Sequence, residues 1–231
     1  MVRGASWSKF SDSIKNENRF HSGMFNADVF ASFLSIVAKN YPAGSKMFRA
    51  RIAPSKSGFP TSGMSIPPKS FRSAGRVNPE GIGILYLSSD DKTVLNEVRA
   101  NTFDYVCIGE FQSKRDIMVV NLSGLSSTSP FLYDGELEKY AANRKVFQEI
   151  AIELARPLRR SDSPLEYLPT QYISEFIKNQ KRYDGIEYAS TLRDGGYNLA
   201  LFDEELFECV NVYTTEVTGI EYKTRQENLQ S

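Results

Sequence analysis

The spacing of apolar residues along the chain predicts a mixture of helices and strands. Apolar positions that recur every three or four residues indicate helices at residues 26–40, 135–155 and 170–179, and a further helix after residue 90. Short apolar runs rich in β-branched and aromatic residues indicate strands at 46–53, 81–88, 105–111, 117–122, 185–188, 197–202 and 209–222. Because helices and strands do not alternate strictly, the pattern predicts an α+β fold rather than a doubly wound sheet.

The first 45 residues divide into two segments of different character. Residues 1–24 are polar and mixed, and they predict a loosely docked arm. The helix at 26–40 begins at Asn26, whose side chain can cap it. Pro42 and Gly44 are expected to end this helix, because proline lacks an amide hydrogen and glycine favours a helix terminus.

A long loop and a strand–helix unit follow in the centre of the chain. Residues 54–74 are rich in Pro, Gly and Ser and have no apolar period, so they predict a loop with a functional or mobile role. The strand at 81–88 is apolar on both alternating sets, which is typical of a strand covered on both faces. Asp90 can cap the next helix. Glu97 falls at the border of that helix's apolar stripe, where its carboxylate can face a cleft.

Composition and charge narrow the classes of partner. A chain of 231 residues with 41% hydrophobic and 24% charged residues is typical of one globular domain. Lys plus Arg number 28, as do Asp plus Glu, and this balance argues against a protein that grips nucleic acid through its phosphates. Residues 1–9 lack the apolar core of a secretion signal, and no apolar run reaches membrane-spanning length. We therefore expect a cytoplasmic protein that makes no membrane contact.

The cysteine and histidine content limits the chemistry. Cys107 and Cys209 each lie in an apolar, strand-like run, and in a reducing cytoplasm they are expected to be buried free thiols. His21 is the single histidine and lies in a polar segment. A zinc site or a histidine-based triad is therefore not expected, and we expect no metal.

Three side chains in the centre of the chain are candidates for chemistry. Arg76, Tyr86 and Glu97 follow one another at intervals of ten and eleven residues. Each alone has an ordinary structural interpretation: a surface arginine in a turn, a tyrosine packed in the core, and a solvated glutamate. A dinucleotide-binding loop that begins at Gly81 is excluded, because the position of its third glycine is occupied by Tyr86.

Taken together, five ordered segments resemble the signature of the RES-domain family, which is named for its Arg, Glu and Ser. They are residues 48–49 (Phe-Arg), 75–78 (Gly-Arg-Val-Asn), 85–87 (Leu-Tyr-Leu) and 97–98 (Glu-Val), and as the fifth the pair of closing strands at 185–190 and 198–202. The resemblance covers residues 46–222, which we expect to form the catalytic domain. Residues 1–45 are then an N-terminal extension, and residues 223–231 a C-terminal tail.

The resemblance implies a fold, a substrate and a set of site residues. Characterised RES-domain proteins resemble ADP-ribosyltransferases, so the implied fold is a mixed, split β-sheet flanked by helices, here with an N-terminal helical extension. These proteins consume NAD as a substrate, and they act as toxins that a partner antitoxin restrains. The implied catalytic residues are Arg76, Tyr86 and Glu97. The implied substrate-binding residues are Arg49, Ser190 and Asn198, and no metal is implied.

Three functions stay open at this point. The first is a toxin of a toxin–antitoxin or phage-defence pair that cleaves the nicotinamide–ribose bond of NAD by hydrolysis or phosphorolysis. The second is an ADP-ribosyltransferase that modifies a protein, or a nucleic acid despite the neutral charge. The third is a non-catalytic NAD-binding module. In each case NAD is a partner, a protein antitoxin is expected, and a homo-oligomer is compatible with the sequence.

Overall fold

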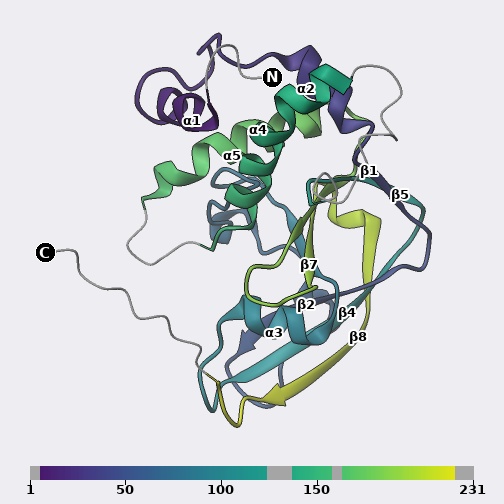
Figure 1. The fold of residues 1–231 in the computed structure, drawn as a ribbon. Coiled ribbons are helices and arrows are strands. Elements are labelled where there is room, and N and C mark those ends of the chain that lie inside the picture. Colours follow the sequence, from purple (N-terminus) through teal and green to yellow (C-terminus); the bar gives the residue numbers. More distant parts are fainter. Residues whose placement is uncertain (1–5, 124–136, 158–162, 222–231) are drawn as a thin grey trace, which may run out of the picture.

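The computed structural model describes residues 6–123, 137–157 and 163–221 and shows an α+β fold built on one eight-stranded sheet (Figure 1). The strands are β1 (Ala38–Tyr41), β2 (Lys46–Ala53), β3 (Leu85–Ser88), β4 (Tyr105–Ser113), β5 (Ile117–Asn121), β6 (Gly185–Ala189), β7 (Tyr197–Leu201) and β8 (Phe207–Glu216). The α-helices are α1 (Trp7–Asn16), α2 (Ala27–Leu34), α3 (Asp91–Val98), α4 (Leu137–Ala155) and α5 (Leu168–Asn179). Short 3₁₀ turns lie at Thr61–Met64, Lys69–Phe71, Pro164–Tyr167 and Glu204–Leu206.

The sheet has two parts that meet at a narrow junction. Its strand order is β1-β5-β6-β7-β3-β2-β4-β8, and every neighbouring pair is antiparallel except β5 and β6, which are parallel. β2 pairs with β4 along its whole length but with β3 only at Phe48 and Ser88. The predicted mixed, split sheet is therefore confirmed, and the split lies between β3 and β2.

The helices form two groups of different size. α1, α2, α4 and α5 gather together, and α4 and α5 contact β6 (Figure 1). Their shared core is aromatic: the Phe30 and Phe147 rings stack with centroids 5.1 Å apart, and Phe25 meets Tyr172 edge-on at 5.4 Å. α3 lies apart from this group and packs on β2 and β4 through Val94. α3 carries Glu97, one of the predicted catalytic residues.

The N-terminal segment departs from its prediction. Within residues 1–24, Trp7–Asn16 forms α1 and is not a loosely docked arm, because Trp7, Phe10 and Ile14 lie on one helical face and are all buried in the main core. Residues 17–21 that follow the helix are exposed. Lys15 on the same helix forms an ion pair with Glu166, with 3.3 Å between Nζ and Oε2. α1 is therefore part of the folded body.

The helix predicted at 26–40 is shorter than expected. Its cap is confirmed, since the Asn26 side chain accepts a hydrogen bond from the Val29 amide at 3.1 Å. The helix ends at Leu34, however, and Ala38–Tyr41 forms β1, which pairs antiparallel with β5. Pairing with a neighbouring strand satisfies the backbone groups of these residues, and a helical period in the sequence cannot reveal such a partner. Pro42 and Gly44 therefore follow a strand.

The remaining elements follow the predictions with shifted ends. The strand at 46–53 is confirmed, and so is the helix capped by Asp90. The strand predicted from residue 81 begins at Leu85, and the strand predicted at 209–222 runs from Phe207 to Glu216. Residues 54–74 form a loop with two 3₁₀ turns, anchored by the fully buried Met64. Residues 135–136, residue 222 and the tail at 223–231 lie outside the described residues.

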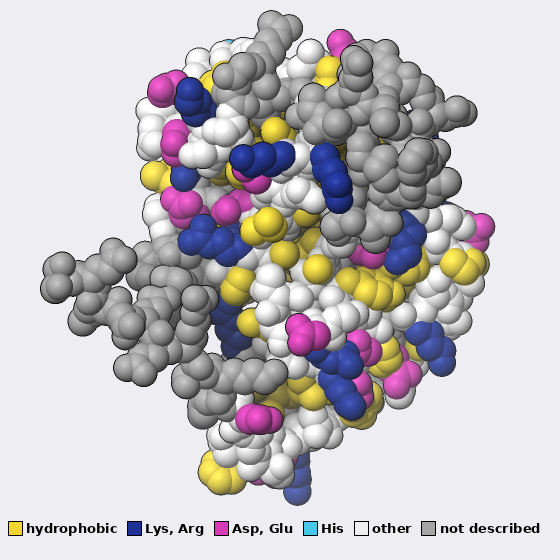
Figure 2. All heavy atoms as spheres, viewed as in Figure 1, with side chains coloured by type: hydrophobic (Ala, Val, Ile, Leu, Met, Phe, Trp, Pro, Cys, Tyr) yellow, Lys and Arg dark blue, Asp and Glu magenta, His cyan; other side chains and the backbone are white. Residues whose placement is uncertain are grey.

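Three further findings concern the cysteines, the helices and the surface charge. Cys107 and Cys209 are free, as predicted; Cys107 is buried, whereas Cys209 is only partly buried. Among the helices that the structure describes, none has the length and apolar character needed to cross a bilayer. On the face in Figure 2, Lys and Arg side chains are interspersed with Asp and Glu side chains, in keeping with the net charge of +0.

Candidate active site

A cavity of about 500 Å³ lies at the junction between the two parts of the sheet. Its walls come from β2, β3, β7, the inner side of α3 and the C-terminal end of α4, and the end of the 54–74 loop borders it. Its size falls within the range of small-molecule sites. Five of the six residues implied by the sequence line it: Arg49, Arg76, Tyr86, Glu97 and Asn198.

The carboxylate of Glu97 is held from two directions. Its Oε1 accepts a hydrogen bond from Ser190 Oγ at 2.8 Å and another from Asn198 Nδ2 at 2.9 Å. Asn198 is fixed in turn by Ser88, whose hydroxyl donates to Asn198 Oδ1 at 2.7 Å. No hydrogen bond from the described part of the chain reaches Oε2 of Glu97. One carboxylate oxygen is therefore held by two side chains, and Glu97 itself lines the cavity.

Ser190 differs from the other five predicted site residues in its position relative to the cavity. It lies behind Glu97 and outside the lining of the cavity, among the residues that the structure describes. Its hydroxyl donates to the carboxylate, and its backbone amide donates to the carbonyl of Gly196 at 2.9 Å. The side chain can thus orient Glu97, and its predicted role in substrate binding stays a prediction.

Arg76 is clamped by the end of α4. Its side chain is only 9% exposed; Nε donates to the carbonyl of Arg156 at 2.5 Å, and Nη1 pairs with Glu153 at 3.0 Å. The guanidinium also lies 5.6 Å from the centre of the Tyr167 ring. Nη2 is buried and has no partner among the described residues. A buried charged donor of this kind is costly unless a ligand satisfies it.

Arg49 supplies a second cation to the same cavity. Its Nη1 is also buried without a partner in the described part of the chain. Burial, and then the nearby Arg51, lower the pKa of Arg49 to about 10, so the guanidinium stays charged at neutral pH. Two arginines with unsatisfied donors in one cavity favour an anionic ligand with more than one negative oxygen.

Tyrosines provide the flat surfaces of the cavity. Tyr86 donates its hydroxyl to Asn78 Oδ1 at 2.7 Å, and burial raises its pKa, so the phenol is neutral. Gly75 permits this arrangement, because a Cβ there would lie 3.0 Å from the Tyr86 hydroxyl oxygen and 2.9 Å from Asn78 Oδ1. Tyr188 also lines the cavity, and burial followed by Tyr86 and Glu97 raises its pKa well above the ordinary value.

Sequence reasoning missed three residues of this site: Tyr188, Glu153 and Tyr167. Tyr188 lies in β6, within the segment 185–190 that resembles the family signature, so its place in that segment was the available signal. Glu153 and Tyr167 carry no such signal, since they are 77 and 91 positions from Arg76. Among the described residues, no group of three His, Cys, Asp or Glu side chains is arranged to hold a metal ion.

Comparisons with known proteins give one family match and one structural match. The family model described as "RES domain" matches residues 47–223. A search of curated proteins found no match. The crystal structure of the M. tuberculosis MbcT-MbcA toxin-antitoxin complex is similar, with a TM-score of 0.46 and 12% identity over 83% of this chain and 93% of that chain.

Proposed function

Because this chain belongs to the RES-domain family, we propose that it is an enzyme that cleaves the bond between nicotinamide and ribose in NAD. The observation that carries the proposal is the state of Glu97. Oε1 of this carboxylate is tied to Ser190 and Asn198, Oε2 accepts no hydrogen bond from the described residues, and two buried arginines line the same cavity. A carboxylate held in this way is suited to a developing positive charge.

The chemistry of the bond explains why such a carboxylate is needed. When nicotinamide leaves, it takes the bonding electrons and becomes neutral, so positive charge builds up on the ribose. A negative oxygen of Glu97 can stabilise that charge and accept a hydrogen bond from a ribose hydroxyl. Water or phosphate then bonds to the ribose carbon and loses a proton. The resulting products are ADP-ribose or its 1-phosphate.

The other residues of the cavity have complementary roles in this proposal. The unsatisfied donors of Arg76 and Arg49 are suited to the pyrophosphate of NAD. The ring of Tyr86 offers a surface for nicotinamide, and Tyr188 adds a second neutral aromatic wall. Ser190 and Asn198 hold Glu97 in place, so Ser190 acts in this proposal through Glu97.

The test is the incubation of purified protein with NAD, with and without phosphate, followed by separation of the products. Release of nicotinamide with ADP-ribose supports hydrolysis, and release with ADP-ribose 1-phosphate supports phosphorolysis. ADP-ribose found on an added protein or nucleic acid would indicate transfer. Intact NAD, without any modified macromolecule, would refute catalysis and favour a binding module.

We also propose that the chain acts as a toxin that a protein antitoxin restrains, on the ground of family membership. Expression of the chain alone should then arrest a bacterial host and lower its NAD pool. Normal growth and an unchanged NAD pool, despite verified soluble expression, would contradict this. We place the antitoxin over the cavity mouth beside the 54–74 loop. Unchanged protease access to this loop in the complex would contradict that placement.

A further inference from the structure

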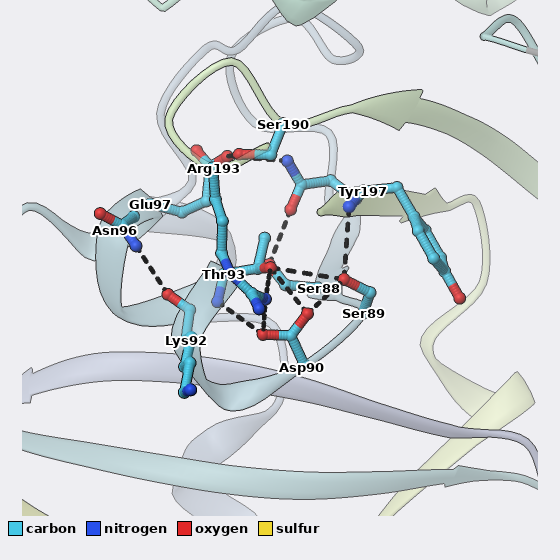
Figure 3. A network of polar contacts seen from close by, with 11 residues as sticks. Ser88, Ser89, Asp90, Lys92, Thr93, Asn96, Glu97, Ser190, Arg193 and Tyr197 are labelled. Atoms are coloured by element: carbon cyan, nitrogen blue, oxygen red, sulfur yellow. Dashed lines mark hydrogen bonds and ion pairs between the residues drawn. The ribbon is translucent and has the colours of Figure 1, made fainter. Parts of the chain in front are cut away.

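The loop between β6 and β7 contacts α3 at both ends of the helix (Figure 3). At the C-terminal end, Ser190 donates to Glu97. At the N-terminal end, Arg193 Nη1 donates to a carboxylate oxygen of Asp90, and it donates to Thr93 Oγ1 at 2.9 Å. A single loop of seven residues therefore spans the helix that carries the proposed catalytic carboxylate.

Asp90 joins the cap of α3 to this loop. Its Oδ1 accepts a hydrogen bond from the Thr93 amide at 2.9 Å, and its Oδ2 accepts from the hydroxyls of Ser89 and Thr93, each at 2.8 Å. Burial acts to raise the pKa of Asp90, but these hydrogen bonds and Arg193 outweigh it, so the net shift is downward. Asp90 is therefore charged at neutral pH. The same carboxylate begins the helix and holds the loop.

The loop lies directly on the helix and leaves little room for adjustment. A Cβ at Gly196 would lie 2.5 Å from Thr93 Oγ1, and Thr93 is fully buried. Gly195 has a φ of +76°, a conformation that favours glycine. Thr191 extends the contact to α4 by donating to the carbonyl of Ala155 at 3.1 Å. A change at Arg193 should consequently be felt at Ser190, three residues away.

We infer that Asp90 and Arg193 are positioning residues for Glu97, an inference that rests on the proposed function. Neither side chain lines the cavity among the described residues, so neither is placed to touch the substrate. Their ion pair sets the separation between the loop and α3. That separation decides whether Ser190 reaches Oε1 of Glu97. The pair thereby affects the reaction step and leaves substrate binding intact.

Two substitutions isolate the ion pair from other roles. Asp90→Asn removes the charge but keeps a side chain that caps helices as well as Asp does. Arg193→Met removes the cation and keeps an unbranched side chain. Arg115→Met is the matched control, because Arg115 forms a comparable pair with Asp184 at 2.8 Å outside the cavity lining.

The measurements are kcat, KM for NAD and the thermal midpoint of each variant. Small misplacements of a catalytic group can cost up to about 100-fold in rate, so we expect both substitutions to lower kcat by roughly 10- to 100-fold. KM should stay within about twofold. The double variant should be no slower than either single variant, and Arg193→Met should cost less in a Ser190→Ala background than alone.

Several results would overturn the inference. The first is an unchanged kcat in Asp90→Asn and Arg193→Met. The second is a double variant in which the two losses of kcat multiply. The third is an equal loss of kcat in Arg115→Met. If the wild type leaves NAD intact, the proposed function fails, and amide hydrogen exchange then decides the positioning alone. Arg193→Met should accelerate exchange over residues 94–98 by about tenfold or more, with Arg115→Met like the wild type. Unchanged exchange in Arg193→Met would refute the positioning role.

Discussion

Replacing Arg49 with methionine should make the protein more stable and a poorer binder of NAD. Burial, and then the nearby Arg51, lower the pKa of Arg49 to about 10, well below the ordinary value of an arginine, so folding is penalised wherever the guanidinium is charged, which includes neutral pH. At about 1.4 kcal/mol for each pKa unit, the penalty is about 3 kcal/mol. Arg49→Met removes this penalty but also loses the packing of the longer arginine side chain. The free energy of unfolding should therefore rise by about 1–2 kcal/mol. For a protein of this size, the thermal midpoint should rise by about 2–8 °C.

The same substitution removes a donor from the proposed pyrophosphate site. A hydrogen bond from a charged group contributes about 1.5–3 kcal/mol, so NAD should bind roughly 10- to 150-fold more weakly. The measurement is calorimetric titration in a Glu97→Gln background, so that NAD is not consumed, together with thermal melts. A buried charge that is retained although it costs stability is expected where a ligand uses it.

Arg51 provides the control, because it lies two residues further along the same strand. Its Nη1 donates to the carbonyl of Gly63, and its guanidinium lies 4.4 Å from the centre of the Phe59 ring. Arg51→Met should therefore lower stability by about 1–2 kcal/mol and leave NAD affinity unchanged. An Arg49→Met protein that melts below the wild type, or that binds NAD equally well, would refute the reasoning about Arg49.

Three further substitutions test the site. Glu97→Gln should lower kcat by a factor of ~10²–10³ with little change in KM, because the lost charge acts mainly in the transition state. A variant with the wild-type kcat would remove this residue from the mechanism. Arg76→Ala should mainly raise KM for NAD, since a pyrophosphate contact is made before and during the reaction, and steady-state kinetics with an unchanged KM would count against that contact. Gly75→Ala should lower the free energy of unfolding by about 1–3 kcal/mol in denaturant titrations, because its methyl group would press on the Tyr86 hydroxyl. Gly219→Ala is the control, because a Cβ there meets nothing within 4 Å. Equal stability of the two variants would contradict the predicted crowding at Gly75.

The sequence determined the class of the fold, and five of the six site residues that it suggested line one cavity. Apolar periods are local properties, so they placed β2 and the helix that Asp90 caps, and they indicated an α+β mixture. The ordered segments around Arg76, Tyr86 and Glu97 were sufficient to suggest the RES-domain family, which the family match confirms. Local pattern failed where a distant partner decided the outcome, as in Ala38–Tyr41, which joins the sheet by pairing with β5.

The tertiary structure decided what each site residue touches. Spacing could not show that Ser190 lies behind Glu97, because that contact joins positions 93 residues apart. It also could not show that Glu153 clamps Arg76 across 77 residues, or that Arg193 reaches the cap of α3 at Asp90 across 103 residues. Hydrogen bonds and ion pairs depend on distance and direction in space, and only the packing of α3, α4 and the β6–β7 loop brings these groups within reach. The sequence thus identifies the types of residue in the site, whereas the contacts of each residue follow from its neighbours in the folded chain.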